Sequence, residues 1–306
     1  MLALAVACFA ALWPFTPGLA QPENLLNLLA TLLPLLIVAI GQLLVLLTGG
    51  IDLSQTSAIA LASVTGAALM NGRDGWLALS PLAVPTALAG MLLVGAVVGG
   101  LNGFAVARLR MPPFIVTLTS MMFVSGLAIF LTHSRNINGL PAAFNALGGT
   151  TWIASLLALA VAAATHVLLT RSQYGRWLYA VGHNATAARV SGVPVAAVVT
   201  AAYVASGVLA ALASVVYTAQ AETGSPVLAQ RLLLDIVGAT VIGGASLLGG
   251  RGTVAGTLAG VVFIKLLDNS LDLLSLSNFG VMIVKGVMIL AAALLDALRT
   301  RLLASA

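Results

Sequence analysis

Residues 25–48 read LLNLLATLLPLLIVAIGQLLVLLT and contain no charged side chain. An α-helix rises about 1.5 Å per residue, so a stretch of roughly this length extends about 36 Å. The hydrocarbon core of a bilayer is about 30 Å thick, and about 20 helical residues cross it. The stretch therefore predicts one transmembrane helix.

The composition extends this prediction to the whole chain of 306 residues. Apolar residues make up 60% of it and charged residues 7%, whereas soluble domains are about one quarter charged. A transmembrane β-barrel would show segments of about ten residues that alternate apolar and polar, but the apolar runs here are continuous. Helices satisfy their own backbone hydrogen bonds in lipid. We therefore expect an all-α membrane protein with one transmembrane domain over residues 1–306.

Apolar segments like the first recur along the chain. The run at 2–20 has no Lys or Arg before it, which favours a membrane span over a cleaved signal peptide. The run at 78–107 exceeds one span, so it must tilt, kink at Pro85 or begin at the interface. The pattern predicts a polytopic bundle of about ten transmembrane helices, at 2–20, 25–48, 55–70, 78–107, 113–132, 152–170, 197–219, 235–249, 253–272 and 279–298.

The arginines between these segments predict the orientation, because cytoplasmic loops are enriched in Lys and Arg. One set of loops holds Arg108, Arg110, Arg171, Arg176, Arg189, Arg251, Arg299 and Arg301. The opposite set holds only Arg73, Arg135 and Arg231, alongside acidic residues. With ten spans, both termini are then expected in the cytoplasm.

Charge and cysteine content exclude other classes of function. The net charge is +5, but the basic residues are scattered singly between apolar runs, which argues against a nucleic-acid interface. Cys8 is the single cysteine, so neither a disulfide framework nor a cysteine metal site is expected. We predict no metal site and no cofactor bound by this chain.

The longest polar break on the arginine-rich side, at about 170–196, contains TRSQYGRWLYAVGHNATAARVSGVP. Asn184 is a good N-cap for a short helix at 185–191, and Gly192 stands where a C′ glycine would end it. Such a helix is either a coupling element that fits a groove on a motor subunit or an interfacial loop whose arginines reach lipid phosphates. The residues alone leave both readings open.

The same segment resembles the cytoplasmic loop of ribose-type permeases of bacterial ABC importers. The matching residues are Gly175, Arg176, Tyr179, Ala180, Gly182, Asn184, Ala187, Ala188, Arg189, Ser191 and Gly192. Further matches follow in the family's order at 49–54 (GGIDLS), 113–118 (PFIVTL), 241–246 (VIGGAS) and 249–253 (GGRGT). The chain departs from the family at Gln55-Thr56, where Val-Gly is usual, and at Leu233, where Glu is usual. These departures weaken any transfer of substrate identity.

The resemblance implies a permease subunit in the bacterial inner (plasma) membrane, which carries a monosaccharide such as ribose, xylose or galactose. It also implies a separate ATPase subunit that uses ATP and Mg, a periplasmic or lipid-anchored sugar-binding protein, and a second permease chain, identical or different. The residues implied to couple to the ATPase are Gly182, Asn184, Ala187, Ala188, Arg189 and Gly192.

The chain carries no phosphate-binding loop of its own. Such a loop would place a glycine before its lysine, and neither Lys265 nor Lys285 follows one. We therefore expect a transport subunit that is not itself an enzyme and has no catalytic residues.

Ionisable and polar side chains inside apolar segments suggest functional or structural sites. Lys265 and Asp268 are three residues apart on one predicted helix, and Lys285 on the next could reach Asp268, as an ion pair or as a gating element. Candidate pathway or gating residues are Asp52, Asn102, Thr117 and Asp235. Asp52 could instead be the N-cap of the helix that follows it.

Two glycine trios recur at helical spacing, Gly95, Gly99 and Gly103 and then Gly252, Gly256 and Gly260. Each trio would leave one bare helix face, for close helix packing or for the wall of a passage.

Two other classes of function remain as alternatives. A secondary transporter would use the buried Asp and Lys residues as an ion relay. A membrane enzyme would need His133, His166 and His183 to meet, and no nucleophile motif accompanies them.

Overall fold

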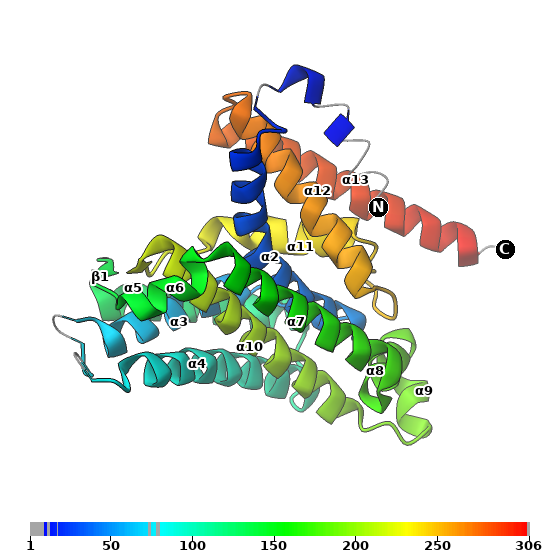
Figure 1. Ribbon diagram of the computed structural model, residues 1–306. Helices are drawn as coiled ribbons and strands as arrows, with labels where there is room; N and C mark the ends of the chain where they lie inside the picture. The colour runs from blue at the N-terminus through cyan, green and yellow to red at the C-terminus, as the bar shows by residue number, and fades with distance from the viewer. Residues whose placement is uncertain (1–8, 11–12, 17, 73–74, 78–79, 305–306) are drawn as a thin grey trace.

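The computed structural model describes residues 9–10, 13–16, 18–72, 75–77 and 80–304. Helices dominate this part of the chain (Figure 1). The long ones are α2 (Pro22–Leu47), α3 (Gln55–Met70), α4 (Ala83–Ala107), α5 (Pro113–Thr132), α7 (Thr151–Arg171), α10 (Val195–Ala221), α12 (Val254–Leu273) and α13 (Asn278–Ala304). The short ones are η1 (Trp13–Phe15), α6 (Ala142–Gly149), α8 (Gln173–His183), α9 (Ala185–Val190), η2 (Gln230–Leu232) and α11 (Leu233–Ile242). The all-α membrane architecture is confirmed.

Helix α2 forms the centre of the core. Every residue from Leu32 to Leu47 is buried, and its neighbours are α7, α10, α11 and α12. A helix that is apolar on all sides can be covered either by other helices or by lipid, and α2 is covered by other helices. By contrast, only 22% of the most apolar window of α5 or of α7 is buried, so these helices present apolar side chains outward, toward lipid.

Helices α4 and α10 make the most extensive helix contact, and glycines permit it. A Cβ atom at Gly95 would overlap the backbone of Gly207, and one at Gly99 would overlap the carbonyl oxygen of Tyr203. The first glycine trio therefore serves helix packing. The second trio was predicted wrongly: Gly252 precedes α12, and only Gly256 and Gly260 pack on the backbone of α11 and the turn after it.

We predict that Gly99→Val destabilises the protein by about 1–3 kcal/mol, because its side chain would separate α4 from α10. Gly100→Ala is the matched control, since a Cβ there would lie 3.9 Å from its nearest neighbour, Val204. Thermal unfolding in detergent should therefore show a lower midpoint for Gly99→Val only. Equal midpoints for both variants would contradict the packing role.

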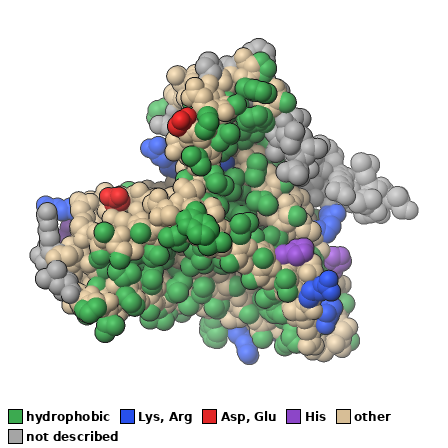
Figure 2. Space-filling model, in the orientation of Figure 1, with side chains coloured by type: hydrophobic (Ala, Val, Ile, Leu, Met, Phe, Trp, Pro, Cys, Tyr) green, Lys and Arg blue, Asp and Glu red, His purple; other side chains and the backbone are tan. Residues whose placement is uncertain are grey.

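The loops gather at two opposite ends of the bundle. At one end the amide of Gly250 donates to the carbonyl of Leu47 over 3.0 Å, and α8 and α9 project there. At the other end the strands β1 (Ile137–Asn138) and β2 (Thr223–Gly224) pair antiparallel, and the amide of Gly72 donates to Gly139. In Figure 2 basic and histidine side chains gather over the end that carries α8 and α9, beside a broad apolar surface.

The predicted count of about ten spans is not confirmed. Six described helices are long and apolar enough to cross a membrane: α2, α4, α5, α7, α10 and α12. Helix α3 and the apolar part of α13 are shorter, and most of the predicted span 2–20 lies outside the described residues. The predicted span 235–249 is wrong, because α11 ends at Ile242 and Gly244 adopts a φ of +94°. In the predicted span 78–107, residues 80–82 are not helical, α4 begins at Ala83 with Pro85 in its first turn, and residues 78–79 lie outside the described residues.

Candidate coupling hairpin and buried polar sites

The polar segment after α7 is a helical hairpin rather than a loop. The side-chain oxygen of Ser172 accepts a hydrogen bond from the amide of Gly175 and so begins α8. The side-chain oxygen of Asn184 accepts from the amide of Ala187 over 2.9 Å, which confirms the predicted N-cap of α9. Helix α9 ends at Val190, one residue earlier than expected, and Gly192 follows with a φ of +84°.

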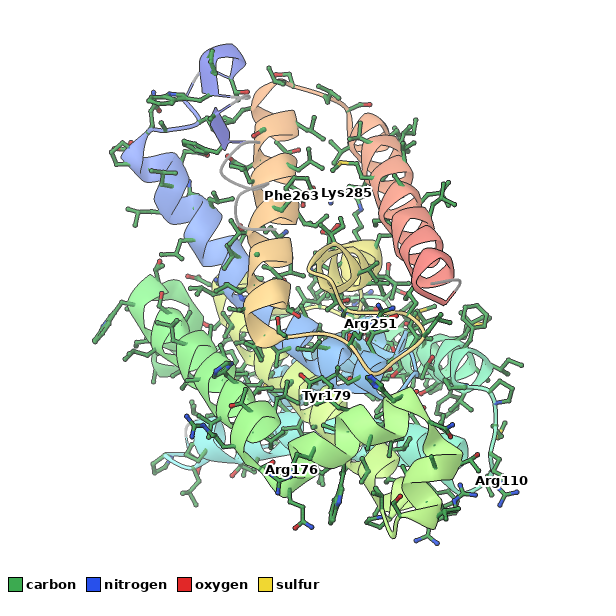
Figure 3. All side chains as sticks on the ribbon, turned by 90° about the vertical axis from the view of Figure 1, so that its right-hand side faces the viewer. Arg110, Arg176, Tyr179, Arg251, Phe263 and Lys285 are labelled. Atoms are coloured by element: carbon green, nitrogen blue, oxygen red, sulfur yellow. The ribbon has the colours of Figure 1, made fainter. Side chains whose placement is uncertain are left out.

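Close backbone contacts join this hairpin to the bundle. A Cβ at Gly182 would overlap the carbonyl oxygen of Leu47 and the amide of Gly250, so only glycine fits there. The hydroxyl of Tyr179 donates to the carbonyl of Gly252 over 2.8 Å, and burial raises the pKa of Tyr179. Figure 3 shows Tyr179 beside the loop that carries Arg251. The hairpin is thereby fixed to the ends of α2 and of the loop before α12.

The face of α9 that points away from the bundle is small and partly apolar. Ala188 is buried against the bundle, while Ala187 is exposed and the side chain of Val190 is 87% exposed. The arrangement is a short capped helix that contacts α8 and α10, and α8 in turn contacts α2, α7 and α10.

A second polar site surrounds Asp52, between α2 and α3. Its carboxylate accepts from the amide and the hydroxyl of Ser54, over 3.0 and 2.6 Å, and from the hydroxyl of Ser206 over 2.7 Å. The amide of Asn102 donates to the Ser54 hydroxyl, and that of Gln55 donates to the Ser206 hydroxyl, each over 2.8 Å. The Ser54 and Ser206 hydroxyls each use their oxygen to accept from an amide, so each hydroxyl proton is donated to the Asp52 carboxylate. The network joins α3, α4 and α10.

This geometry decides between the alternatives for Asp52. The N-cap of α3 is Ser54, so the prediction that Asp52 caps this helix is wrong. Gln55, which departs from the pattern of the resembling family, is part of the network. Thr117 lies nearby and donates to the carbonyls of Ile51 and Pro113. Asp52, Asn102 and Thr117 are all buried, and their role in a pathway stays a prediction.

The third site is a cluster of four charges on α11, α12 and α13. Lys285 contacts Asp235 at 2.7 Å and Asp268 at 2.6 Å. Lys265 lies 3.6 Å from Asp268 and 3.9 Å from Asp235. Figure 3 shows Lys285 between α12 and α13. The predicted trio is thus in contact, and the structure adds Asp235, which sequence reasoning had grouped with Asp52.

The cluster balances two lysines against two aspartates and links three helices in the C-terminal third of the chain. No sequence signal joined Asp235 to it, since Asp235 precedes Lys285 by fifty residues. Among the described residues, no three His, Cys, Asp or Glu side chains are grouped to hold a metal ion. The four charges form an ion-pair network between α11, α12 and α13, and a gating role for it stays a prediction.

A comparison with known protein families identifies the family of this molecule. The model described as "Branched-chain amino acid transport system / permease component" matches residues 24–293. This chain belongs to that permease family. The permease is accordingly a multi-pass membrane protein and a transport subunit, not an enzyme, as expected from the sequence.

Relatives of this permease confirm the resemblance to ribose-type permeases. The ribose import permease protein RbsC of Bacillus subtilis (strain 168) is 37% identical over 290 residues, which cover 92% of this chain and 86% of the relative. RbsC of Escherichia coli (strain K12) is 34% identical, covering 92% and 88%. The L-arabinose transport system permease protein AraH of E. coli (strain K12) is 32% identical, covering 97% and 89%. No solved structure matches the permease.

Proposed function

We propose that this permease conducts a monosaccharide across the bacterial inner membrane and couples the passage to ATP hydrolysis by a separate ATPase subunit. The observation that carries the proposal is the capped hairpin α8–α9, fixed by Gly182 to the ends of two other segments. The relatives are named for ribose and arabinose transport, and one is named a probable ABC transporter permease protein. The family description names branched-chain amino acids, so the sugar must be tested against them.

The proposed complex has further partners. A second permease chain, identical or different, would complete the pathway, and a periplasmic or lipid-anchored sugar-binding protein would deliver substrate at the end with β1 and β2. ATP and Mg would bind to the ATPase. We place both termini on the side of that ATPase, in line with the arginine distribution.

The coupling step follows from the shape of the hairpin. Closure of the ATPase subunits on ATP would press on the exposed side of α9, including Ala187 and Val190. Gly182 leaves no space between α8 and the carbonyl of Leu47, so the push reaches α2 directly. Asn184 and Gly192 keep α9 as a rigid unit by ending it at both sides.

The substrate is tested by transport in proteoliposomes that contain the permease, its ATPase and its binding protein. We expect uptake of one monosaccharide from a panel of ribose, arabinose, xylose and galactose, driven by ATP and not by an ion gradient. Uptake of leucine or isoleucine instead would refute the sugar assignment. Uptake without ATP, collapsed by an ionophore, would favour a secondary transporter.

We predict that Gly192→Val lowers substrate-stimulated ATPase activity at least about fivefold. A β-branched residue at a φ of +84° is strained by about 1–2 kcal/mol, so the end of α9 must rearrange. Gly192→Asn is the matched control, because asparagine tolerates this conformation and a Cβ here meets no atom within 4 Å. Assembly should be normal in both variants. Full stimulation in Gly192→Val would contradict the coupling role of α9.

A further inference from the structure

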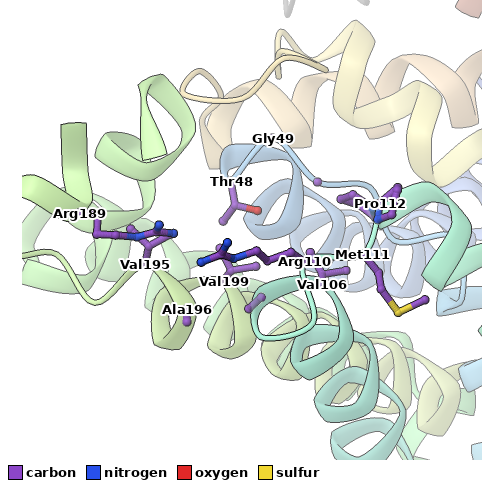
Figure 4. Close-up of a pocket in the computed structure, with 13 residues that line it drawn as sticks. Thr48, Gly49, Val106, Arg110, Met111, Pro112, Arg189, Val195, Ala196 and Val199 are labelled. Atoms are coloured by element: carbon purple, nitrogen blue, oxygen red, sulfur yellow. The ribbon is translucent and has the colours of Figure 1, made fainter. Parts of the chain in front are cut away.

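A cavity of about 480 Å³ lies at the arginine-rich end of the bundle, beside α9. The end of α2, the turn between α4 and α5 and the first turns of α10 enclose it (Figure 4). Its lining is mostly apolar or backbone, apart from Thr48 and two arginines, Arg110 and Arg189. No acidic residue contributes to it.

The two arginines give this cavity its chemistry. Their guanidinium groups point toward each other across it (Figure 4). Both side chains are exposed to solvent where they line the open cavity, and neither makes a hydrogen bond or an ion pair with any residue in the described part of the chain. An anion between them could accept hydrogen bonds from both guanidinium groups at once.

The turn at the end of α4 brings Arg110 to the cavity. Arg110 adopts a φ of +56°, a left-handed conformation that costs energy for a residue other than glycine. Five other described residues besides glycine also have a positive φ, and this conformation is common where a helix ends. Here the strained residue follows the last turn of α4 and its side chain enters the cavity.

The surroundings indicate which anion fits. Helix α4 ends at Ala107, so the cavity lies where an apolar span leaves the hydrocarbon core. On the last turns of α4, Leu101 and Phe104 are 65% and 52% exposed, and they offer an apolar surface for an acyl chain. A basic pocket between helices at this depth is suited to an anionic headgroup.

We propose that this cavity binds the phosphate of an anionic phospholipid, held between Arg110 and Arg189, with its acyl chains along α4. The bound lipid would join the α4–α5 turn to α9. Arg189, whose side chain lies in the cavity, then acts on the lipid rather than on an ATPase surface. The site is independent of which solute the permease carries.

The test compares Arg110→Gln, Arg189→Gln and the double variant with the unchanged permease, each purified with its ATPase. Phosphatidylglycerol binding is measured by native mass spectrometry and by the shift in unfolding temperature when phosphatidylglycerol vesicles are added. We expect the double variant to bind at least about tenfold more weakly and to lose the shift. Arg176→Gln is the control, because Arg176 is exposed on α8 outside the cavity and should leave binding unchanged.

Three outcomes would overturn the proposal. One is equal phosphatidylglycerol binding by the double variant and the unchanged protein. Another is a shift in unfolding temperature with inorganic phosphate as large as the shift with phosphatidylglycerol vesicles. That result would assign the site to a soluble anion. The third is loss of ATPase association by the double variant with lipid binding intact, which would assign the arginines to a carboxylate of the partner. Zwitterionic phosphatidylcholine vesicles should give no shift that depends on Arg110.

Discussion

Replacing Asp52 by alanine is expected to lower the stability of the permease by about 3 kcal/mol or more. The carboxylate is the acceptor for the amide and hydroxyl of Ser54 and for the hydroxyl of Ser206, and all three donors are buried. Each buried donor that loses its partner costs about 1–3 kcal/mol. The loss should loosen the junction of α3 with α4 and α10, which makes this one of the two largest effects we predict.

Thermal unfolding in detergent or nanodiscs measures the effect. Asp52→Asn should lie between the unchanged protein and Asp52→Ala, because its amide keeps one acceptor but turns a donor toward a hydroxyl. Asp272→Ala is the control, since the Asp272 side chain is exposed near the end of α12. If Asp52→Ala unfolded at the same temperature as the control, the network would not hold α3 in place.

Replacing Lys285 by methionine is expected to cost about 3–5 kcal/mol, because it leaves Asp235 and Asp268 with only Lys265 as a partner. Removing one member of a buried ion pair typically has this effect, since an uncompensated charge stays behind. The three described partners are shielded, with side-chain exposures of 3% for Asp235, 15% for Asp268 and 12% for Lys265. Helix α13 should then detach from α11 and α12 more readily.

The double variant Asp235→Asn/Lys285→Met separates charge balance from simple loss of contact. It removes one charge of each sign and leaves the Lys265–Asp268 pair at 3.6 Å. We expect it to recover more than half of the stability lost in Lys285→Met, measured as the unfolding midpoint or as resistance to limited proteolysis. Arg176→Met is the matched control, because this exposed side chain should have little effect. A double variant less stable than Lys285→Met would show that the ion pair itself, and not the balance of charge, holds these helices.

Elements governed by local forces could be predicted from the sequence. The apolar run 25–48 became α2, Pro22–Leu47, and the runs at 113–132 and 152–170 became α5 and α7 to within one residue. The N-cap at Asn184 and the glycine after α9 were also predicted, because a cap needs only residues within one turn. The wrong prediction of a span at 235–249 also comes from reliance on local sequence features. Its apolar residues continue past Gly243 and Gly244, and hydropathy does not register the turn that these glycines permit.

The sequence by itself therefore determined that this chain is a membrane-embedded helical permease with a capped helix on its arginine-rich side. Hydropathy, helix length and capping act over a few residues, so they can be read without a fold. Only the tertiary structure decided that Asp235 meets Lys285, that Ser206 binds Asp52, and that Arg110 and Arg189 share a cavity. These contacts depend on how each helix is rotated and where it crosses its neighbours, and uniformly apolar helices carry little sequence pattern that would specify either.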